Sequence, residues 1–281
     1  MPEMQMPALS RRSLLCGAGA MLAAPSAFAQ SGPLSDLSQI YRQQPLRVAM
    51  PGFASQPFFE AADADNSGLD VELCQTIASV LEVEVAFDRS PSTFDEAVER
   101  IARGDADLAI CKLSRTVRRG RQILYSRPYA MLNHGLITNR VRFARMAGGE
   151  PAENVVRDFR GDLGVIAHSS FAEFAGASFP NANVREFADW KSMIDAVRSE
   201  SIDMAYRDDF EIKKLLVDDP SLTVVARSVT LTDKTDTLAI GIRPDAQHLA
   251  AFADLFLDLA RGGEPMKSDA IVARYRAARG A

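Results

Sequence analysis

Short apolar runs and amphipathic segments alternate regularly along this chain, separated by few residues, and this alternation limits the folds that the chain can adopt. Such alternation is typical of an α/β protein, in which helices cover both faces of a parallel sheet. In the first block the pattern predicts strand, helix, strand, helix and strand, over Leu46–Met50, Leu69–Leu81, Val83–Phe87, Phe94–Arg103 and Ala106–Cys111.

A second block of the same kind follows an apolar stretch at Met131–Thr138. Its predicted strands are Leu163–Ala167, Val184–Phe187 and Ile202–Tyr206, with helices at Phe171–Ala177 and Trp190–Arg198. The remaining residues predict helices at Phe210–Leu216, Leu249–Ala260 and Ser268–Ala278, and strands at Leu222–Ala226 and Leu238–Ile242.

The two blocks share one unit at an offset of 96 residues. The predicted helix that begins at Phe94 aligns without a gap with the one that begins at Trp190, and Asp107 aligns with Asp203. Helix–strand units also resemble one another by chance, but two aspartates at one offset favour two lobes of similar design. The same match places Lys112 and Asp208 just beyond the ends of equivalent strands.

The N-terminal residues predict an export signal. Residues 1–29 combine Arg11-Arg12, an apolar run from Leu14 to Ala24 and a small-x-small cleavage site at Ala27-Phe28-Ala29. The arginine pair resembles the twin-arginine signal, although Leu14 stands where phenylalanine is usual, and a Sec signal with two incidental arginines stays open. Either signal predicts a periplasmic protein.

Composition excludes several classes of function. With 32 basic and 37 acidic residues the net charge is −5, which argues against a protein that binds nucleic acid or a membrane surface through a basic face. The three histidines lack ligand spacing, and no P-loop, dinucleotide or G-x-S-x-G motif appears, so no metal and no cofactor are expected. Cys74 and Cys111 follow the signal; a disulfide and two buried thiols both stay open.

Two adjoining motifs carry a family resemblance. Ser114-Arg115-Thr116-Val117-Arg118-Arg119 has the form S-x-T-x-x-R, and Tyr125-Ser126-Arg127-Pro128-Tyr129 follows it. With Leu46–Met50, Gly68–Leu73 and Gly104–Asp107 before them, they resemble the bacterial extracellular solute-binding proteins of the polar-amino-acid family, family 3, which feed ABC importers. The resemblance runs from about residue 45 to 275.

The resemblance implies a fold of the periplasmic binding protein type II class. This is an α/β fold of two doubly wound lobes, joined by two hinge strands, that close on a ligand. Lobe 1 would comprise residues 34–133 and 236–281, and lobe 2 residues 134–235. The crossings would fall near Ala130–Leu136 and Asp233–Ala239.

The resemblance also implies a ligand site. Arg119 is the expected partner of a ligand carboxylate, because a guanidinium offers a planar pair of donors. Asp208 would take the ligand ammonium; an alternative role is to cap the helix that follows. Further expected carboxylate contacts come from the hydroxyl and amide groups of Ser114, Thr116, Ser169 and Ser170.

Three positions depart from the family pattern. His168 stands where glycine is usual, so a positive φ there would strain the loop. Lys112 replaces a small polar residue; a buried lysine would favour a ligand with an extra negative group, and an exposed one would reach solvent. Phe53 is the expected aromatic contact, one residue out of register, and Phe58 is equally suited to the core.

The expected function is capture of an amino acid, or of a similar small zwitterion or carboxylate, for an ABC permease in the inner membrane. The chain is expected to be a monomer, not an enzyme, and to bind no nucleic acid. Two alternatives stay open: a dehydratase resembling cyclohexadienyl dehydratase on the same fold, and a ligand sensor that docks on a membrane receptor. The dehydratase hypothesis requires a second acidic group in the cleft, and the motifs do not identify one.

Overall fold

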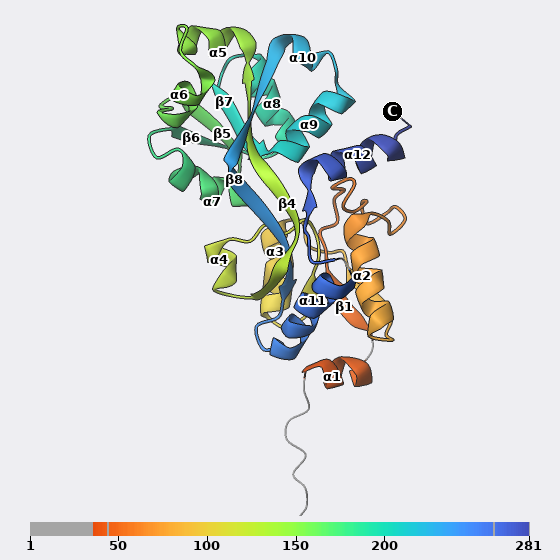
Figure 1. The fold of residues 1–281 in the computed structure, drawn as a ribbon. Coiled ribbons are helices and arrows are strands. Elements are labelled where there is room, and N and C mark those ends of the chain that lie inside the picture. The colour runs from red at the N-terminus through yellow and green to blue at the C-terminus, as the bar shows by residue number, and fades with distance from the viewer. Residues whose placement is uncertain (1–35, 44, 261, 281) are drawn as a thin grey trace, which may run out of the picture. The chain divides into compact units, whose positions relative to one another are not determined.

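Strands and helices alternate along the residues that the computed structural model describes, which are 36–43, 45–260 and 262–280. The predicted signal peptide, residues 1–29, lies outside the described residues. The first half of the molecule is built from α1 (Asp36–Gln43), β1 (Leu46–Ala49), α2 (Leu69–Val80), β2 (Val85–Asp88), α3 (Phe94–Ala102), β3 (Leu108–Ala109) and α4 (Val117–Gly120) (Figure 1).

The second half repeats the alternation. Its elements are α5 (Arg140–Ala147), α6 (Ala152–Arg157), β5 (Asp162–Ile166), α7 (Ser170–Ser178), β6 (Asn183–Phe187), α8 (Trp190–Arg198), β7 (Met204–Asp208), α9 (Asp209–Asp218) and α10 (Leu222–Val225). Within each half the short strands pair in parallel, β1 with β2 and β3, and β5 with β6 and β7.

Two long strands, β4 (Leu124–Asn139) and β8 (Ala226–Ile242), run through both halves and pair antiparallel with each other (Figure 1). They belong to one sheet of order β2-β1-β3-β8-β4-β7-β5-β6, in which β9 (Met266–Lys267) additionally pairs with β4. Their register shifts between the Asn133–Thr235 and His134–Leu231 pairs, at the level of both predicted crossings. Such a bulge bends a strand and increases its local twist.

The chain returns to the first half after β8. Helices α11 (Gln247–Ala260) and α12 (Ser268–Ala278), with β9 (Met266–Lys267) between them, contribute Leu249, Phe256 and Ile271 to the same buried cluster as Leu46 of β1. The second half buries two further clusters, one around Leu163 and another that includes Met193 of α8. The mixed α/β fold with an open sheet confirms the predicted fold class.

One predicted element is wrong. Residues 222–226 were expected to form a strand, but Leu222–Val225 forms helix α10, and β8 starts only at Ala226. The amide of Leu222 donates to the carbonyl of Asp219, and that of Thr223 to the carbonyl of Pro220. Pro220 stands at the second position of the turn from Asp219 to Leu222, a position that proline favours, and this turn leads into the helix despite the apolar, β-branched run.

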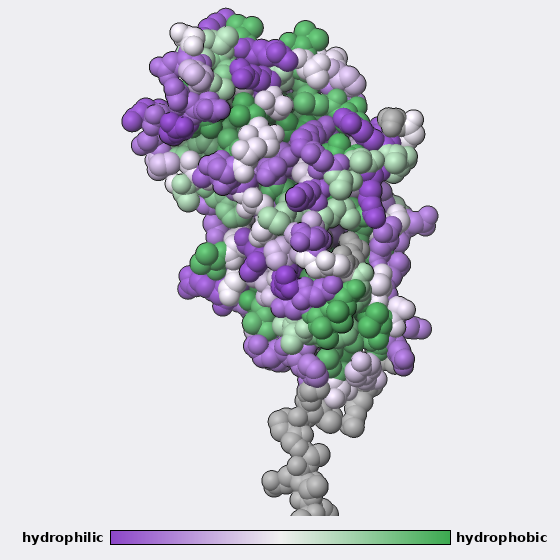
Figure 2. All heavy atoms as spheres, in the orientation of Figure 1, coloured by the Kyte–Doolittle hydropathy of each residue, from purple (hydrophilic) through white to green (hydrophobic). Residues whose placement is uncertain are grey.

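The surface carries mostly polar side chains on the face shown in Figure 2, with apolar ones gathered over α11. Leu255 and Leu259 of that helix are exposed. Within the described residues, no helix combines the length and apolar character that a bilayer crossing requires.

Candidate functional site

A cavity of about 760 Å³ lies between the two halves, a volume typical of small-molecule sites. The first half contributes residues that follow β1 and β3, and the second half contributes the starts of α7, α8 and α9. Of the eight residues expected to bind the ligand, seven line this cavity: Phe53, Lys112, Ser114, Arg119, Ser169, Ser170 and Asp208.

Arg119 is fixed by the short helix α4. Thr116 caps this helix, its hydroxyl accepting from the amide of Arg119 at 3.2 Å. The guanidinium is 2% exposed; Nε contacts Asp95 at 2.9 Å and Nη1 donates to the carbonyl of Ser114 at 3.1 Å. Nη2 has no partner among the described residues. A buried, unpaired guanidinium nitrogen is costly unless a ligand supplies an acceptor.

Thr116 itself does not line the cavity. The expectation that its hydroxyl contacts the ligand is therefore corrected: the hydroxyl caps α4 and positions Arg119 instead. Ser169 lines the cavity, but its hydroxyl is used within the protein, since it donates to the carbonyl of Ile166 and accepts from the amide of Ala172 as the N-cap of α7.

Ser114 and Ser170 link the two halves. The hydroxyl of Ser170 donates to that of Ser114 at 3.0 Å, and Ser114 donates to Oδ2 of Asp236 at 2.8 Å. A second link joins Arg118 of α4 to Glu173 of α7, with Nε and Oε2 3.4 Å apart. The polar groups of the two halves thus meet beside the cavity.

Lys112 makes a further link across the cavity. Its Nζ lies 3.1 Å from Oδ2 of Asp208 and 2.7 Å from Oε1 of Glu211. Burial alone would lower the pKa of Lys112, but these two carboxylates outweigh burial and raise it, so the side chain stays charged. Because the protein itself compensates this charge, Lys112 does not present a free cation to a ligand. The side chain is buried and does not reach solvent, and the expected preference for a ligand with an additional negative group stays a prediction.

Asp236 on β8 is the residue that sequence reasoning missed most clearly. Its side chain is buried, it lines the cavity, and Oδ1 has no partner among the described residues. Burial, reinforced by the carboxylate of Asp208, raises the pKa of Asp236 to about 7. Near neutral pH this carboxyl group is therefore partly protonated and able to donate a hydrogen bond into the cavity.

Other lining residues also carried no clear motif. Trp190 begins α8, and the guanidinium of Arg207 lies 5.0 Å from the centre of its ring. Glu211 had a local signal: it stands three residues after Asp208, the spacing of a capping box. Asp208 does cap α9, since its Oδ1 accepts from the amide of Glu211 at 2.9 Å, so the capping and cavity-lining roles coexist.

The other residues that depart from the family pattern, His168 and Phe53, both line the cavity. His168 lines the cavity as an exposed residue with φ of 56°, the left-handed conformation predicted to strain a histidine. Phe53 packs edge-on against Phe94, their ring centres 5.4 Å apart. Phe58 is buried in the core, where its ring contacts Phe210.

His134 lies next to the cavity on β4. Its ring is buried, Nδ1 contacts the hydroxyl of Tyr206, and it packs on Phe174. Burial lowers the pKa of His134 to about 4, so the imidazole is neutral at pH 7. Tyr206 lines the cavity, which makes His134 a support for a lining residue.

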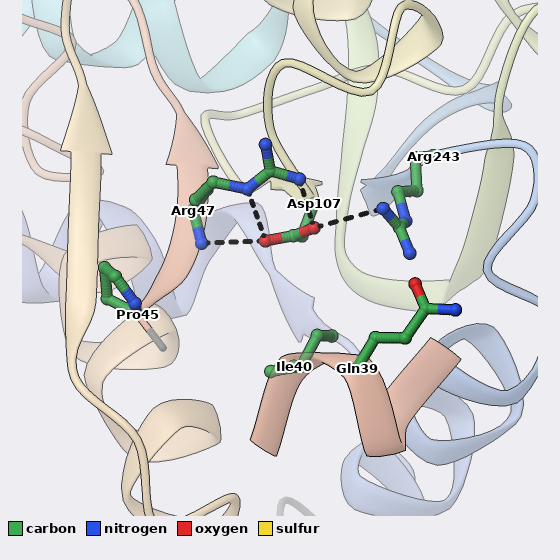
Figure 3. Close-up of a pocket in the computed structure, with 6 residues that line it drawn as sticks. All are labelled: Gln39, Ile40, Pro45, Arg47, Asp107 and Arg243. Atoms are coloured by element: carbon green, nitrogen blue, oxygen red, sulfur yellow. Dashed lines mark hydrogen bonds and ion pairs between the residues drawn. The ribbon is translucent and has the colours of Figure 1, made fainter. Parts of the chain in front are cut away.

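A second, smaller cavity of about 150 Å³ lies beside the start of β1. Asp107 occupies its wall between the guanidinium groups of Arg47 and Arg243, as Figure 3 shows. Nε of Arg47 donates to Oδ2 of Asp107 at 3.1 Å. The carboxylate neutralises the nearer arginine, so this cluster holds strand ends together rather than offering a free charge.

The described residues contain no group of three or more histidine, cysteine, aspartate or glutamate side chains placed to hold a metal ion. Cys74 and Cys111 are buried free thiols, which decides the alternative that the sequence left open. Burial raises the pKa of both thiols.

Comparisons with known proteins support the family resemblance. Residues 46–151 match the family model of the bacterial extracellular solute-binding proteins, family 3. The chain is also 25% identical over 186 residues to the membrane-bound lytic murein transglycosylase F 1 of Alkalilimnicola ehrlichii. That match covers 64% of this chain but only 36% of the relative, so the chain spans about a third of the length of this curated protein.

Solved structures share the fold. An amino acid ABC transporter substrate-binding protein of Streptococcus pneumoniae, bound to L-arginine, has a TM-score of 0.63 at 22% identity, covering 84% of this chain and 96% of that one. A cysteine-binding protein of Campylobacter jejuni has a TM-score of 0.60 at 18% identity, covering 87% and 92%. An ancestral amino-acid-binding protein, a precursor of cyclohexadienyl dehydratase, has a TM-score of 0.63 at 18% identity, covering 86% and 99%.

Proposed function

Because residues 46–151 belong to the bacterial extracellular solute-binding proteins of family 3, we propose that this chain is a periplasmic protein that captures a small ligand for an ABC importer. The ligand is an amino acid or a similar small zwitterion or carboxylate. It lies in the cavity between the halves, and a permease in the inner membrane receives it.

One observation carries this proposal. The buried Arg119 lines the cavity, and its Nη2 is unpaired among the described residues, while Nε and Nη1 are held by Asp95 and the carbonyl of Ser114. Two fixed nitrogens pre-organise the third, so a carboxylate oxygen gains a charge-assisted hydrogen bond without ordering the arginine. Aromatic rings of Phe53 and Trp190 supply apolar surface for the rest of the ligand.

A thermal-shift screen of the purified protein against amino acids and small organic acids tests the proposal. A ligand at a hundredfold excess over its Kd stabilises the folded state by about 2.7 kcal/mol, which gives a clear shift in Tm. We expect at least one small carboxylate to produce it, and the shift to vanish in Arg119→Met. A screen without any hit among small acids would contradict the proposal.

A second function, elimination of carbon dioxide and water from a prephenate-like acid, is favoured by Asp236. The dehydratase reading needs an acidic group in the cavity, and a carboxyl group with a pKa of about 7 and a free Oδ1 is suited to give its proton to a leaving hydroxyl. Incubation with prephenate or arogenate would yield an aromatic product that absorbs in the ultraviolet. If the native protein forms the product and Asp236→Asn does not, the protein is an enzyme. If the acid binds but no product forms, only the transport function remains.

A further inference from the structure

We propose that the ligand of this cavity is a carboxylic acid that carries no ammonium group, because Lys112 fills the ammonium-binding position with its own side chain. This inference rests on the proposed function and narrows the ligand class of the same site.

The surroundings of Lys112 are those that recognise a primary ammonium group. Nζ contacts the carboxylates of Asp208 and Glu211, and it lies 5.5 Å and 5.4 Å from the ring centres of Phe58 and Phe210. Carboxylates and aromatic faces are the usual partners of an ammonium ion in a protein. The lysine side chain is only 6% exposed. A ligand ammonium would therefore have to expel a buried, paired one.

No other carboxylate in the lining of the cavity offers an equivalent place. Asp236 binds Ser114 through Oδ2, and its raised pKa leaves it partly neutral. Asp189 is exposed, and its Oδ1 accepts from the amide of Ser192 at 2.7 Å as the N-cap of α8. An exposed ion pair is worth little, so Asp189 would not hold an ammonium firmly.

The groups that do remain available favour an anion. Arg119 has an unpaired Nη2 at 2% exposure, and protonated Asp236 has an unpaired Oδ1. The N-termini of α7 and α8 also face the cavity, since Ser170 and Trp190 are their first residues and line it. The partial positive charge of these helix ends adds to the attraction for a carboxylate. The cavity is thus equipped for negative charge and already filled where it would take positive charge.

The test compares acids that differ only in the amino group: succinate with aspartate, glutarate with glutamate, propionate with alanine, and 3-phenylpropionate with phenylalanine. Binding to the purified protein is measured by isothermal titration and by the shift in Tm. We expect the acid that binds to do so at least tenfold more tightly than its amino counterpart.

The variant Lys112→Gly tests the cause. Lys112 has φ of 53°, a conformation that suits glycine, so this change removes the lysine ammonium from between Asp208 and Glu211 without straining the backbone. We expect its preference to reverse, with the amino acid gaining at least tenfold over the acid. Lys267→Met removes an exposed lysine that does not line the cavity, so the preference of the native protein should persist.

The outcomes separate the two claims. An amino acid that binds the native protein as tightly as its deaminated partner overturns the inference and leaves the proposed function standing. Failure of every acid and amino acid to bind both the native protein and Lys112→Gly contradicts the proposed function, and the inference falls with it. If Lys112→Gly does not fold, the comparison within the native protein decides.

Discussion

The two halves of the molecule use a matched aspartate for the same structural task. Oδ2 of Asp107 accepts from the amide of Arg47 at 3.0 Å, and Oδ2 of Asp203 accepts from the amide of Asp162 at 2.7 Å. In both cases the amide belongs to the start of a neighbouring strand, and a guanidinium binds the same carboxylate, from Arg47 in one half and Arg142 in the other. Helices α3 and α8 keep the same offset, capped by Thr93 and Asp189.

The two halves differ at the next matched position, which is occupied by Lys112 in the first half and Asp208 in the second. Lys112 lies beyond the end of β3, and Asp208 is the last residue of β7; they carry opposite charges and pair with each other across the cavity. The repeat thus preserves the aspartates that hold neighbouring strands together. At the matched positions that line the cavity, the two halves instead carry side chains of opposite charge. Four experiments address this division.

Breaking the Lys112–Asp208 pair should have the largest effect on stability. Lys112→Met leaves Asp208 and Glu211 buried without their main cation, and loss of one partner from a buried pair costs about 3–5 kcal/mol. In the double variant Lys112→Met/Asp208→Asn one of those carboxylates is neutral, so its free energy of unfolding should exceed that expected from the sum of the single changes. Urea unfolding measures the cycle; strictly additive losses would contradict coupling across the cavity.

Arg119 has no counterpart in the second half, where Leu215 stands at the matched position. Arg119→Met should therefore weaken binding of the identified ligand roughly 100-fold, about 2.7 kcal/mol, because Arg119 is buried with an unpaired nitrogen, whereas Arg207 in the same lining lies against Asp208, Glu211 and the ring of Trp190. Isothermal titration measures the loss. Arg121→Met, two residues along and exposed, is the matched control and should bind normally.

The matched aspartates should lose similar stability when truncated. Asp107→Ala and Asp203→Ala each leave a strand amide and a guanidinium without an acceptor, at a cost of about 1–3 kcal/mol. Asp105→Ala, at an exposed neighbouring position, is expected to change the free energy of unfolding by less than about 0.5 kcal/mol. A large loss in only one half would show that the two aspartates are not equivalent.

Asp236 lies on β8, which runs through both halves and is not part of the repeated unit. It should make the free energy of unfolding depend on pH. Its pKa rises from 3.8 to about 7 on folding, so the folded state binds the proton more tightly. The stabilisation it contributes is complete below pH 4 and is lost as the pH rises through 7. Between these values the native protein should lose about 1.4 kcal/mol per pH unit relative to Asp236→Asn.

The difference between the two unfolding curves at pH 4, 5.5, 7 and 8 measures this loss, because the other titrating groups cancel in it. Curves that stay parallel over this range would show that Asp236 is ionised throughout, and would remove the argument for a proton donor in the cavity.

Local sequence patterns were sufficient to predict the elements whose conformation depends on residues close by in the chain. The periodicity of α3 and α8 follows from residues within a few turns of one another. The short motif around Arg119 also led to the cavity, although the role of Thr116 changed from ligand contact to helix cap. Leu222–Val225 shows the limit of propensity, since an apolar β-branched run folded as a helix behind Pro220.

The cavity chemistry required the fold. Asp236 had no local signal, because its burial and raised pKa arise only where β8 passes beside Ser114, 122 residues away in the chain. Lys112 could be recognised as unusual from the sequence, but the sequence left open whether it faced solvent or ligand.

The chain's own residues determined the alternation of elements, the repeated unit and a candidate guanidinium, because these depend on spacing along a few turns or strands. Only the tertiary structure decided that Lys112 pairs with Asp208 and that Asp236 is buried, because charge and burial depend on which distant segments come within a few ångströms.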